Sequence, residues 1–171
     1  MRKIFGIVGW SGSGKTELIK SLIKIFTTQY NLKVCAIKHA HENFKIDQEG
    51  KDTYKFYEAG ASKIIISSSK QWATINRVVN NNELSLDDLL KHSTEYDLVL
   101  IEGWKYSNLD NKIEVYREIN NKPLLYENDD KIIAIASDKM HSLEKKNIQI
   151  PLLDLNNFSE IAKFIIEYEI K

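Results

Sequence analysis

The sequence predicts an α/β protein with a mostly parallel central sheet, helices on both faces and an added antiparallel strand pair. Five short apolar runs are continuous rather than alternating, as expected for strands covered on both faces. Stretches with helical periodicity lie between them, and a repeated strand–helix–strand order implies right-handed crossovers within one open sheet. The five runs are residues 4–8, 34–37, 64–66, 98–101 and 132–136.

The expected helices are indicated by apolar spacing and by capping residues. Apolar residues share one face over residues 18–26, and residues 52–59 form a short helical stretch that is followed by a glycine. Ser85 begins a capping box that opens a further helix. Apolar residues at helical spacing over 158–168 predict a last helix, capped near Asn157.

Two segments interrupt the alternation of strands and helices. Residues 72–79 and 113–117 are rich in β-branched and aromatic side chains, and each is followed by an Asn-containing turn. We expect these segments to be the added strands, antiparallel and near an edge of the sheet.

Length and composition limit the classes of function. A chain of 171 residues suits one compact domain over residues 1–171. Lys plus Arg and Asp plus Glu both number 24, so bulk charge gives no reason to propose nucleic acid or an acidic membrane as a partner. The single cysteine, Cys35, excludes an intrachain disulfide and a thiolate cluster. The sequence has neither a membrane-length apolar stretch nor a signal-peptide core, so we expect a cytoplasmic protein.

A glycine-rich loop between the first expected strand and the first expected helix carries the strongest chemical signal. Residues 9–16 read GWSGSGKT and match G-x-x-x-x-G-K-[ST]. Glycines let several backbone N–H groups point at one anion, and the helix start adds partial positive charge. The motif predicts a three-layer P-loop NTPase fold, with Lys15 on the β- and γ-phosphates and the Thr16 hydroxyl on Mg²⁺. The expected nucleotide-binding residues of the loop are Gly9, Ser11, Gly12, Ser13, Gly14, Lys15, Thr16 and Glu17.

An acidic residue follows the fourth apolar run. A P-loop site requires a carboxylate at the end of a neighbouring strand to hold Mg²⁺, directly or through water. Glu102 has this position, directly after residues 98–101. Glu102 therefore predicts a metal site together with Thr16, and capping of the next turn is the alternative role.

The loop after the second apolar run collects charged and imidazole side chains at the same expected edge. Asp47 is a candidate catalytic and metal-site residue, which would sense the γ-phosphate through Mg²⁺ or an attacking water. His39 and His41 are either neutral surface residues or contacts to a second anionic ligand beside the nucleotide. Lys38 and Lys51 favour the second alternative, because both are cations near the phosphate end.

Several blocks in this order resemble the molybdopterin-guanine dinucleotide biosynthesis protein B (MobB) family. The resemblance implies a GTP-binding protein with weak GTPase activity that forms dimers and assists MobA, the nucleotidyltransferase that attaches GMP to molybdopterin. Ala40 and Glu42 stand where a further His is common in the family, and Trp104 stands where Phe is usual. The blocks are residues 9–16, KHAH at 38–41, DQEGKDT at 47–53, AGA at 59–61, LVLIEGWK at 98–105 and KIEVYR at 112–117.

The choice between GTP and ATP must be made outside the phosphate loop. Guanine presents two donors on one edge, N1–H and the 2-amino group, which one carboxylate can accept together. The sequence has no N-K-x-D motif, and its nearest equivalent is ASDK at residues 136–139. Asp138 is therefore a candidate guanine-binding residue, with an ordinary turn aspartate as the alternative.

Hydrolysis is expected to be slow. No catalytic Gln is evident near the loop, and Arg117 is the best candidate among Arg2, Arg77 and Arg117 for an arginine finger. An ordinary ion pair is the alternative role for Arg117. The expected catalytic set is thus Lys15, Asp47 and Arg117.

Two other readings of the same motifs stay open. A small-molecule kinase would use the same loop together with an acceptor pocket and a lid carrying arginines. A pure adapter would use the nucleotide only to order a surface for a partner enzyme. The added strands either pair across a homodimer or form an intramolecular hairpin.

Overall fold

The computed structural model describes residues 2–41, 44, 46–78 and 83–169. These residues form two compact units, one made of residues 1–39 and 90–171 and the other of residues 40–89. The single domain expected over residues 1–171 stays a prediction. In chain order the elements are β1 Lys3–Val8, α1 Lys15–Thr28, β2 Val34–Lys38, α2 Asp52–Glu58, β3 Lys63–Ser67, β4 Trp72–Asn76, α3 Leu86–Lys91, β5 Leu98–Glu102, β6 Lys112–Tyr116, the 3₁₀ turns η1 Glu118–Asn120 and η2 Tyr126–Asn128, β7 Ile132–Ser137, α4 Met140–Glu144, β8 Leu152–Asp154 and α5 Phe158–Glu167.

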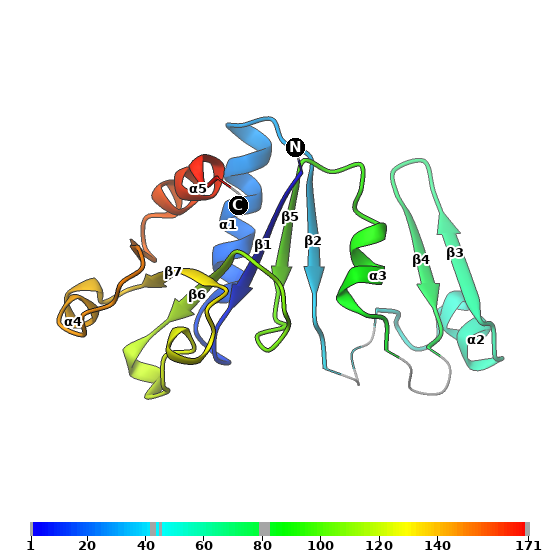
Figure 1. The fold of residues 1–171 in the computed structure, drawn as a ribbon. Coiled ribbons are helices and arrows are strands. Elements are labelled where there is room, and N and C mark those ends of the chain that lie inside the picture. Colours follow the sequence, from blue (N-terminus) through cyan, green and yellow to red (C-terminus); the bar gives the residue numbers. More distant parts are fainter. Residues whose placement is uncertain (1, 42–43, 45, 79–82, 170–171) are drawn as a thin grey trace. The chain divides into compact units, whose positions relative to one another are not determined.

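The first unit is built on a six-stranded sheet with the order β2-β5-β1-β6-β7-β8. Every strand pair in it is parallel (Figure 1). The strand β1 lies between β5 and β6, so its carboxyl end is at the centre of one edge of the sheet. The predicted three-layer P-loop NTPase fold with a mostly parallel sheet is confirmed.

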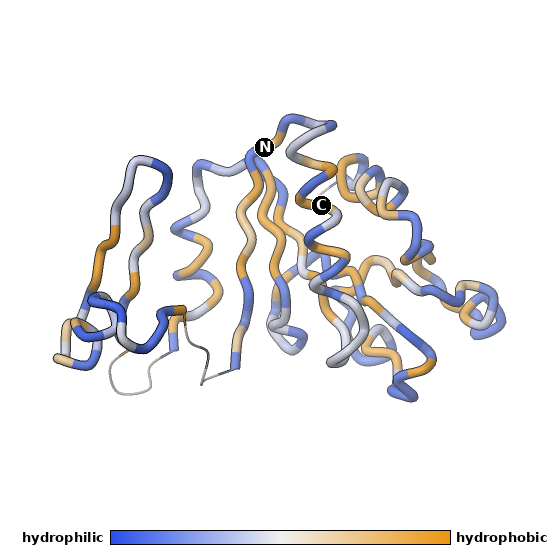
Figure 2. Tube along the Cα trace, turned by 180° about the vertical axis from the view of Figure 1, so that it is seen from behind, coloured by the Kyte–Doolittle hydropathy of each residue, from blue (hydrophilic) through white to orange (hydrophobic). Residues whose placement is uncertain are grey.

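Helices α1 and α5 cover one face of this sheet. Leu18, Leu22 and Phe26 of α1 are fully buried and belong to one apolar cluster with Phe5 and Ile7 of β1. The strands of the sheet are drawn mostly in hydrophobic colours, and the loops at their ends are mostly hydrophilic (Figure 2). This contrast reflects strands that are covered on both faces.

A smaller cluster lies on the opposite face. Leu143 of α4 packs there with Tyr116 of β6 and Ile135 of β7. Neither α4 nor β8 was expected from the sequence, because five residues of helix and three of strand are too short to produce a readable periodicity.

The expectation for residues 113–117 was wrong. They belong largely to β6, which is a central parallel strand between β1 and β7 and not an antiparallel edge strand. All five residues of β6 are buried. Even the charged side chains of this strand, Lys112 and Glu114, are buried, at 1% and 0% exposure.

Glu114 is satisfied by backbone donors. Its two carboxylate oxygens accept hydrogen bonds from the N–H groups of Leu125 at 2.8 Å and Tyr126 at 2.9 Å. Burial raises the pKa of Glu114 above its ordinary value of 4.5, although these two hydrogen bonds oppose the shift. Glu114 therefore fixes the connection between β6 and β7 to the sheet at a cost in charge desolvation.

The second unit contains the antiparallel pair, formed by β3 and β4. Residues 64–66 were expected in the parallel sheet, and this was wrong. Of β3 only Ile64 is buried, whereas Ile65 is 66% exposed, so the continuous apolar run does not indicate two covered faces in this unit. The partner strand β4 ends at Asn76, and Val79 of the expected segment lies outside the described residues.

The predicted helix starts agree with the structure. The Asn157 side chain accepts a hydrogen bond from the Glu160 N–H at 3.2 Å at the start of α5. The Ser85 hydroxyl likewise accepts one from the Asp88 N–H at 3.1 Å before α3. In the described part of the chain, no helix has the length and apolar character needed to cross a bilayer.

The buried carboxyl of Glu114 predicts a pH dependence of stability. A carboxyl whose pKa is raised in the folded state stabilises most below its ordinary pKa of 4.5, and this contribution is lost as the pH rises through the folded-state value. The free energy of unfolding of wild type relative to Glu114→Gln should therefore fall as the pH increases from 4.5. Urea unfolding of both proteins over this range tests it, and parallel pH profiles would contradict it.

Candidate functional site

The glycine-rich loop connects β1 to α1 at the carboxyl edge of the sheet. Gly9 has φ +142°, and a Cβ atom at this position would lie 2.4 Å from the Val115 carbonyl oxygen and 2.9 Å from the Ser13 hydroxyl oxygen. Gly14, which precedes α1, has φ +100°. These glycines allow the chain to pass directly against β6 and then to turn into the helix with its N–H groups facing inward.

Lys15 spans the loop. Its ammonium nitrogen donates hydrogen bonds to the carbonyl oxygens of Gly9 and Trp10, both at 2.9 Å. The cation is thereby held beside the N–H groups at the start of α1. An anion between these donors and the ammonium group would receive hydrogen bonds from both.

Thr16 and Glu102 meet across the edge of the sheet. The Thr16 hydroxyl donates to a Glu102 carboxylate oxygen at 3.0 Å, and the ammonium nitrogen of Lys38 lies 3.4 Å from the same oxygen. Adjacent ligands of an octahedral Mg²⁺, each at 2.0–2.1 Å, are also about 3 Å apart. The Thr16–Glu102 pair therefore fits two neighbouring positions of a Mg²⁺ shell, the rest of which phosphate oxygens and water would fill. In the described residues no three His, Cys, Asp or Glu side chains gather into a further metal site.

Several cations surround this edge. Burial lowers the pKa of Lys15 from its ordinary value of 10.5, the Glu102 carboxylate opposes this shift, and the nearby Lys105 and Lys38 lower the pKa further. The ammonium groups of Lys15, Lys38 and Lys105 surround the Glu102 carboxylate, so positive charge is in excess at this edge of the sheet. This excess suits a polyanion such as a triphosphate, although the chain has no net charge.

Arg117 lies on the outer side of the loop. Its Nε donates to the Ser13 carbonyl oxygen at 3.0 Å, and one terminal nitrogen lies 3.3 Å from the Asp138 carboxylate. The Ser13 carbonyl points toward Arg117. Because the C=O and N–H of a trans peptide point in opposite directions, the Gly14 N–H points away from Arg117. Asp138 and Arg117, predicted from separate motifs, are thus brought together beside the loop.

Three buried polar atoms near the loop have no hydrogen-bond partner within the described part of the chain. They are the Ser13 hydroxyl oxygen, the second carboxylate oxygen of Asp138 and the amide nitrogen of Asn120. Asn120 approaches the loop, because its amide oxygen is 4.0 Å from the Cβ position of Gly12. Buried polar groups without partners are costly, and a bound ligand would satisfy them.

Sequence reasoning missed Asn120 and Lys105 as members of this site. Lys105 follows β5 by three residues, and Asn120 ends the turn η1 that follows β6. The rule that ligands bind beyond the carboxyl ends of parallel strands is the signal that could have found both.

His39 also lies at this edge, directly after β2. Its ring stacks on the Trp104 ring with centroids 4.6 Å apart and an interplanar angle of 26°. The Trp104 backbone has φ +48°, which is uncommon for a residue with a bulky side chain. On the first turn of α1, Glu17 pairs with Lys20 at 3.1 Å on the exposed surface, and Ser11 is exposed at the tip of the loop.

Three predicted site residues belong to the second unit and are described within it. Asp47 accepts a hydrogen bond from the Gln48 N–H at 2.9 Å, and its other carboxylate oxygen is buried with no partner among the residues described. Lys51 is the exposed residue that precedes α2. His41 is exposed, and Glu42 lies outside the described residues. The roles of Asp47, Lys51 and His41 in the site stay predictions.

A side chain at Gly9 should destabilise the protein more than a side chain at Gly12, because only Gly9 lies directly against β6. In Gly12→Ala the new methyl group meets only the Asn120 amide oxygen, at 4.0 Å. The loss of stability should then come from the strain of an alanine at φ +76°, about 1 kcal/mol. Gly9→Ala adds a collision with the Val115 carbonyl and should destabilise by about 2 kcal/mol more. Urea unfolding of the two variants measures this difference, and equal losses would show that Gly9 does not press against β6.

Comparison with known proteins identifies the family. Residues 4–138 match the family model described as molybdopterin guanine dinucleotide synthesis protein B. The molybdopterin-guanine dinucleotide biosynthesis adapter protein of Haemophilus influenzae is 38% identical over 95% of this chain and 86% of its own. The adapter protein of the same description from Escherichia coli K12 is 32% identical over 98% and 94%.

Solved structures agree with this assignment. A crystal structure of molybdopterin-guanine biosynthesis protein B has a TM-score of 0.72 and 29% identity, covering 95% of this chain and 96% of that one. The structure of Bacillus subtilis MobB, at 21% identity, shares the fold with a TM-score of 0.68 over 99% of both chains. The sequence, the fold and the phosphate loop therefore place this chain in the MobB family.

Proposed function

We propose that this protein is a GTP-binding adapter in the biosynthesis of molybdopterin guanine dinucleotide, where it assists a MobA-type nucleotidyltransferase in the cytoplasm. One observation carries the proposal. The Lys15 ammonium group bonds to the Gly9 and Trp10 carbonyl oxygens across the loop, while the next residue, Thr16, bonds to the Glu102 carboxylate. Both relatives above are named as adapter proteins of this biosynthesis. Molybdopterin and GTP are the small molecules that such an adapter would bring to the partner enzyme.

The phosphate loop holds the triphosphate in this proposal. The N–H groups of residues 9–16 donate to phosphate oxygens, and Lys15 exchanges its bonds to the Gly9 and Trp10 carbonyl oxygens for bonds to phosphate. Thr16 and Glu102 hold Mg²⁺, which supplies charge neutralisation for the β- and γ-phosphates.

In this proposal the Asp138 carboxylate recognises the guanine base. One of its carboxylate oxygens is engaged by Arg117 at 3.3 Å, and the other is buried without a partner in the described residues. A carboxylate fixed in this way accepts the N1–H and 2-amino donors of guanine, whereas adenine presents an acceptor at its N1. Preference for GTP over ATP follows from this difference in hydrogen bonding.

Hydrolysis is slow in this proposal. Arg117 is occupied by the Ser13 carbonyl and by Asp138, so it stabilises the loop and would have to leave both partners to act as an arginine finger. In this proposal Asp47 senses the γ-phosphate through Mg²⁺ or an attacking water. Without a free finger, the factor of about 10³–10⁵ that such an arginine supplies is absent. An adapter needs nucleotide binding more than rapid turnover.

Two copies of the chain associate through the second unit. On the β3–β4 pair, Ile65 and Trp72 are 66% and 73% exposed, and their strand positions put them on one face. Burying such a face stabilises a dimer, because apolar surface leaves water. Sedimentation equilibrium of wild type against Trp72→Lys tests this, and an unchanged mass distribution would remove this face from the proposal.

The proposal is tested by titrating the purified protein with GTP, ATP and Mg²⁺ in a calorimeter. Wild type should bind GTP, and Lys15→Ala should bind it at least about tenfold more weakly, because a charge-assisted bond to phosphate is lost. Lys20→Ala is the matched control, since Lys20 is exposed on the same helix and pairs with Glu17. Phosphate release in the same samples should be slow, and absence of heat with either nucleotide refutes the proposal.

The base preference is tested separately with Asp138→Ala. Loss of the Arg117 contact should weaken both nucleotides, so the ratio of the GTP and ATP affinities is the informative quantity. This ratio should fall by about tenfold or more, because the guanine donors lose a charged acceptor. Asp87→Ala, a change at an exposed aspartate, is the control. A ratio that does not change in Asp138→Ala would exclude Asp138 as the guanine reader.

A further inference from the structure

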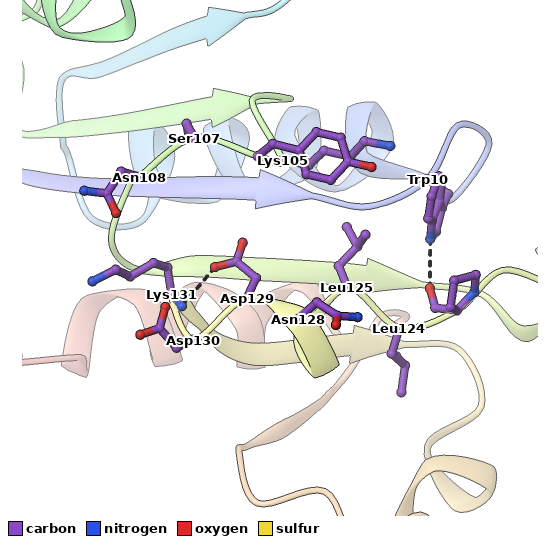
Figure 3. A pocket seen from close by; sticks show the side chains of 12 residues that line it. Trp10, Lys105, Ser107, Asn108, Leu124, Leu125, Asn128, Asp129, Asp130 and Lys131 are labelled. Atoms are coloured by element: carbon purple, nitrogen blue, oxygen red, sulfur yellow. Dashed lines mark hydrogen bonds between the residues drawn. The ribbon is translucent and has the colours of Figure 1, made fainter.

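A pocket of about 420 Å³ lies beside the phosphate loop and shares Trp10 and Lys105 with the nucleotide site (Figure 3). One wall is the connection after β5, around Lys105, and the other is the connection between β6 and β7, at residues 123–131. Only Trp10 of the phosphate loop reaches it, at one end. The volume is within the range of small-molecule sites, about 300–1,000 Å³.

Buried charged groups join the two walls. The ammonium group of Lys112, at 1% exposure, donates to the Ser107 carbonyl oxygen at 2.5 Å in one wall and to the Asp129 carboxylate at 2.8 Å in the other. Asp129 also accepts from the Lys131 N–H at 3.0 Å. From the same face of β6, Glu114 holds the backbone of the second wall. The pocket is therefore preformed and not a gap between mobile loops.

The end near the phosphate loop is cationic. The Trp10 indole N–H donates to the Pro123 carbonyl oxygen at 2.8 Å, which fixes the ring as an end wall. The ammonium groups of Lys105 and Lys122 lie 3.9 Å and 5.7 Å from the centre of this ring. In the described residues neither lysine forms a salt bridge with a carboxylate. Lys105 lines the pocket at this end, and its ammonium group suits an anionic group such as phosphate.

The middle and far end combine an apolar surface with hydrogen-bond acceptors. The Leu125 side chain and the Asp129 carboxylate point into the space between the walls (Figure 3). Each Asp129 oxygen accepts one hydrogen bond from the protein, which leaves further acceptor capacity toward the pocket. A flat ring over Leu125 with N–H groups on its edge would match this surface.

We propose that this pocket binds a flat, amino-substituted heterocycle that carries a phosphate. The ring lies on Leu125 with its N–H edge on Asp129, and the phosphate reaches Lys105. A phosphorylated pterin and a guanine mononucleotide share this chemistry. The inference rests on the proposed function and deepens it, because it assigns a second ligand site that has only Trp10 in common with residues 9–16.

The test uses the full chain by calorimetry, with and without saturating GTP and Mg²⁺. The probes are 6-hydroxymethylpterin monophosphate, GMP and unphosphorylated 6-hydroxymethylpterin. Leu125→Trp should abolish binding of the first probe by filling the pocket. Lys105→Gln should weaken the phosphorylated probes about tenfold and leave the unphosphorylated one unchanged. Lys163→Gln, which alters an exposed lysine of α5 paired with Glu167, is the control.

The outcomes separate the two proposals. Binding of the pterin phosphate, or of GMP in the presence of GTP, with the stated sensitivity to Leu125→Trp and Lys105→Gln supports the pocket and identifies the source of its ligand. Binding that disappears with excess GTP or in Lys15→Ala places the probe in the phosphate loop and overturns the inference. No binding of any probe, while GTP binds normally, overturns the inference and leaves the proposed function intact.

Discussion

The position of β1 in the strand order is the constraint on which the rest of the structure depends. Because β1 lies between β5 and β6 and all strand pairs are parallel, the chain must leave β1 at the middle of one edge. The ends of β2, β5, β6 and β7 then open around the same point. Glu102 and Arg117 contact the phosphate loop for this reason, and Asp138 pairs with Arg117, although the three are far apart in the sequence.

The sequence predicted the parts of the site that depend on local chemistry. The glycines and Lys15 form a contiguous motif, and Glu102 follows a continuous apolar strand, so both could be placed without knowing any long-range contact. The contact of Arg117 with the Ser13 carbonyl could not be foreseen, because it joins residues 104 positions apart. Asn120 was missed because the strand before it, β6, was expected at an edge and not within the parallel sheet.

The errors in the predicted fold show that the polarity of residues along a strand does not report how far the strand is buried. Lys112 and Glu114 are charged residues of a central strand, and each is bonded to groups in the connections that cover the sheet. The opposite error occurred at β3, where Ile65 is exposed although its neighbours are apolar. Hydropathy patterns identify strands well, but the covering of each face is decided by tertiary contacts.

Trp10 belongs at once to the phosphate loop and to the wall of the neighbouring pocket. Its carbonyl oxygen accepts from Lys15, while its indole N–H donates to Pro123. A ligand of the loop that moved the Trp10 backbone would also move the indole ring that closes the pocket. Thermodynamic linkage would make any such coupling reciprocal, and Trp10 is the residue through which it would pass.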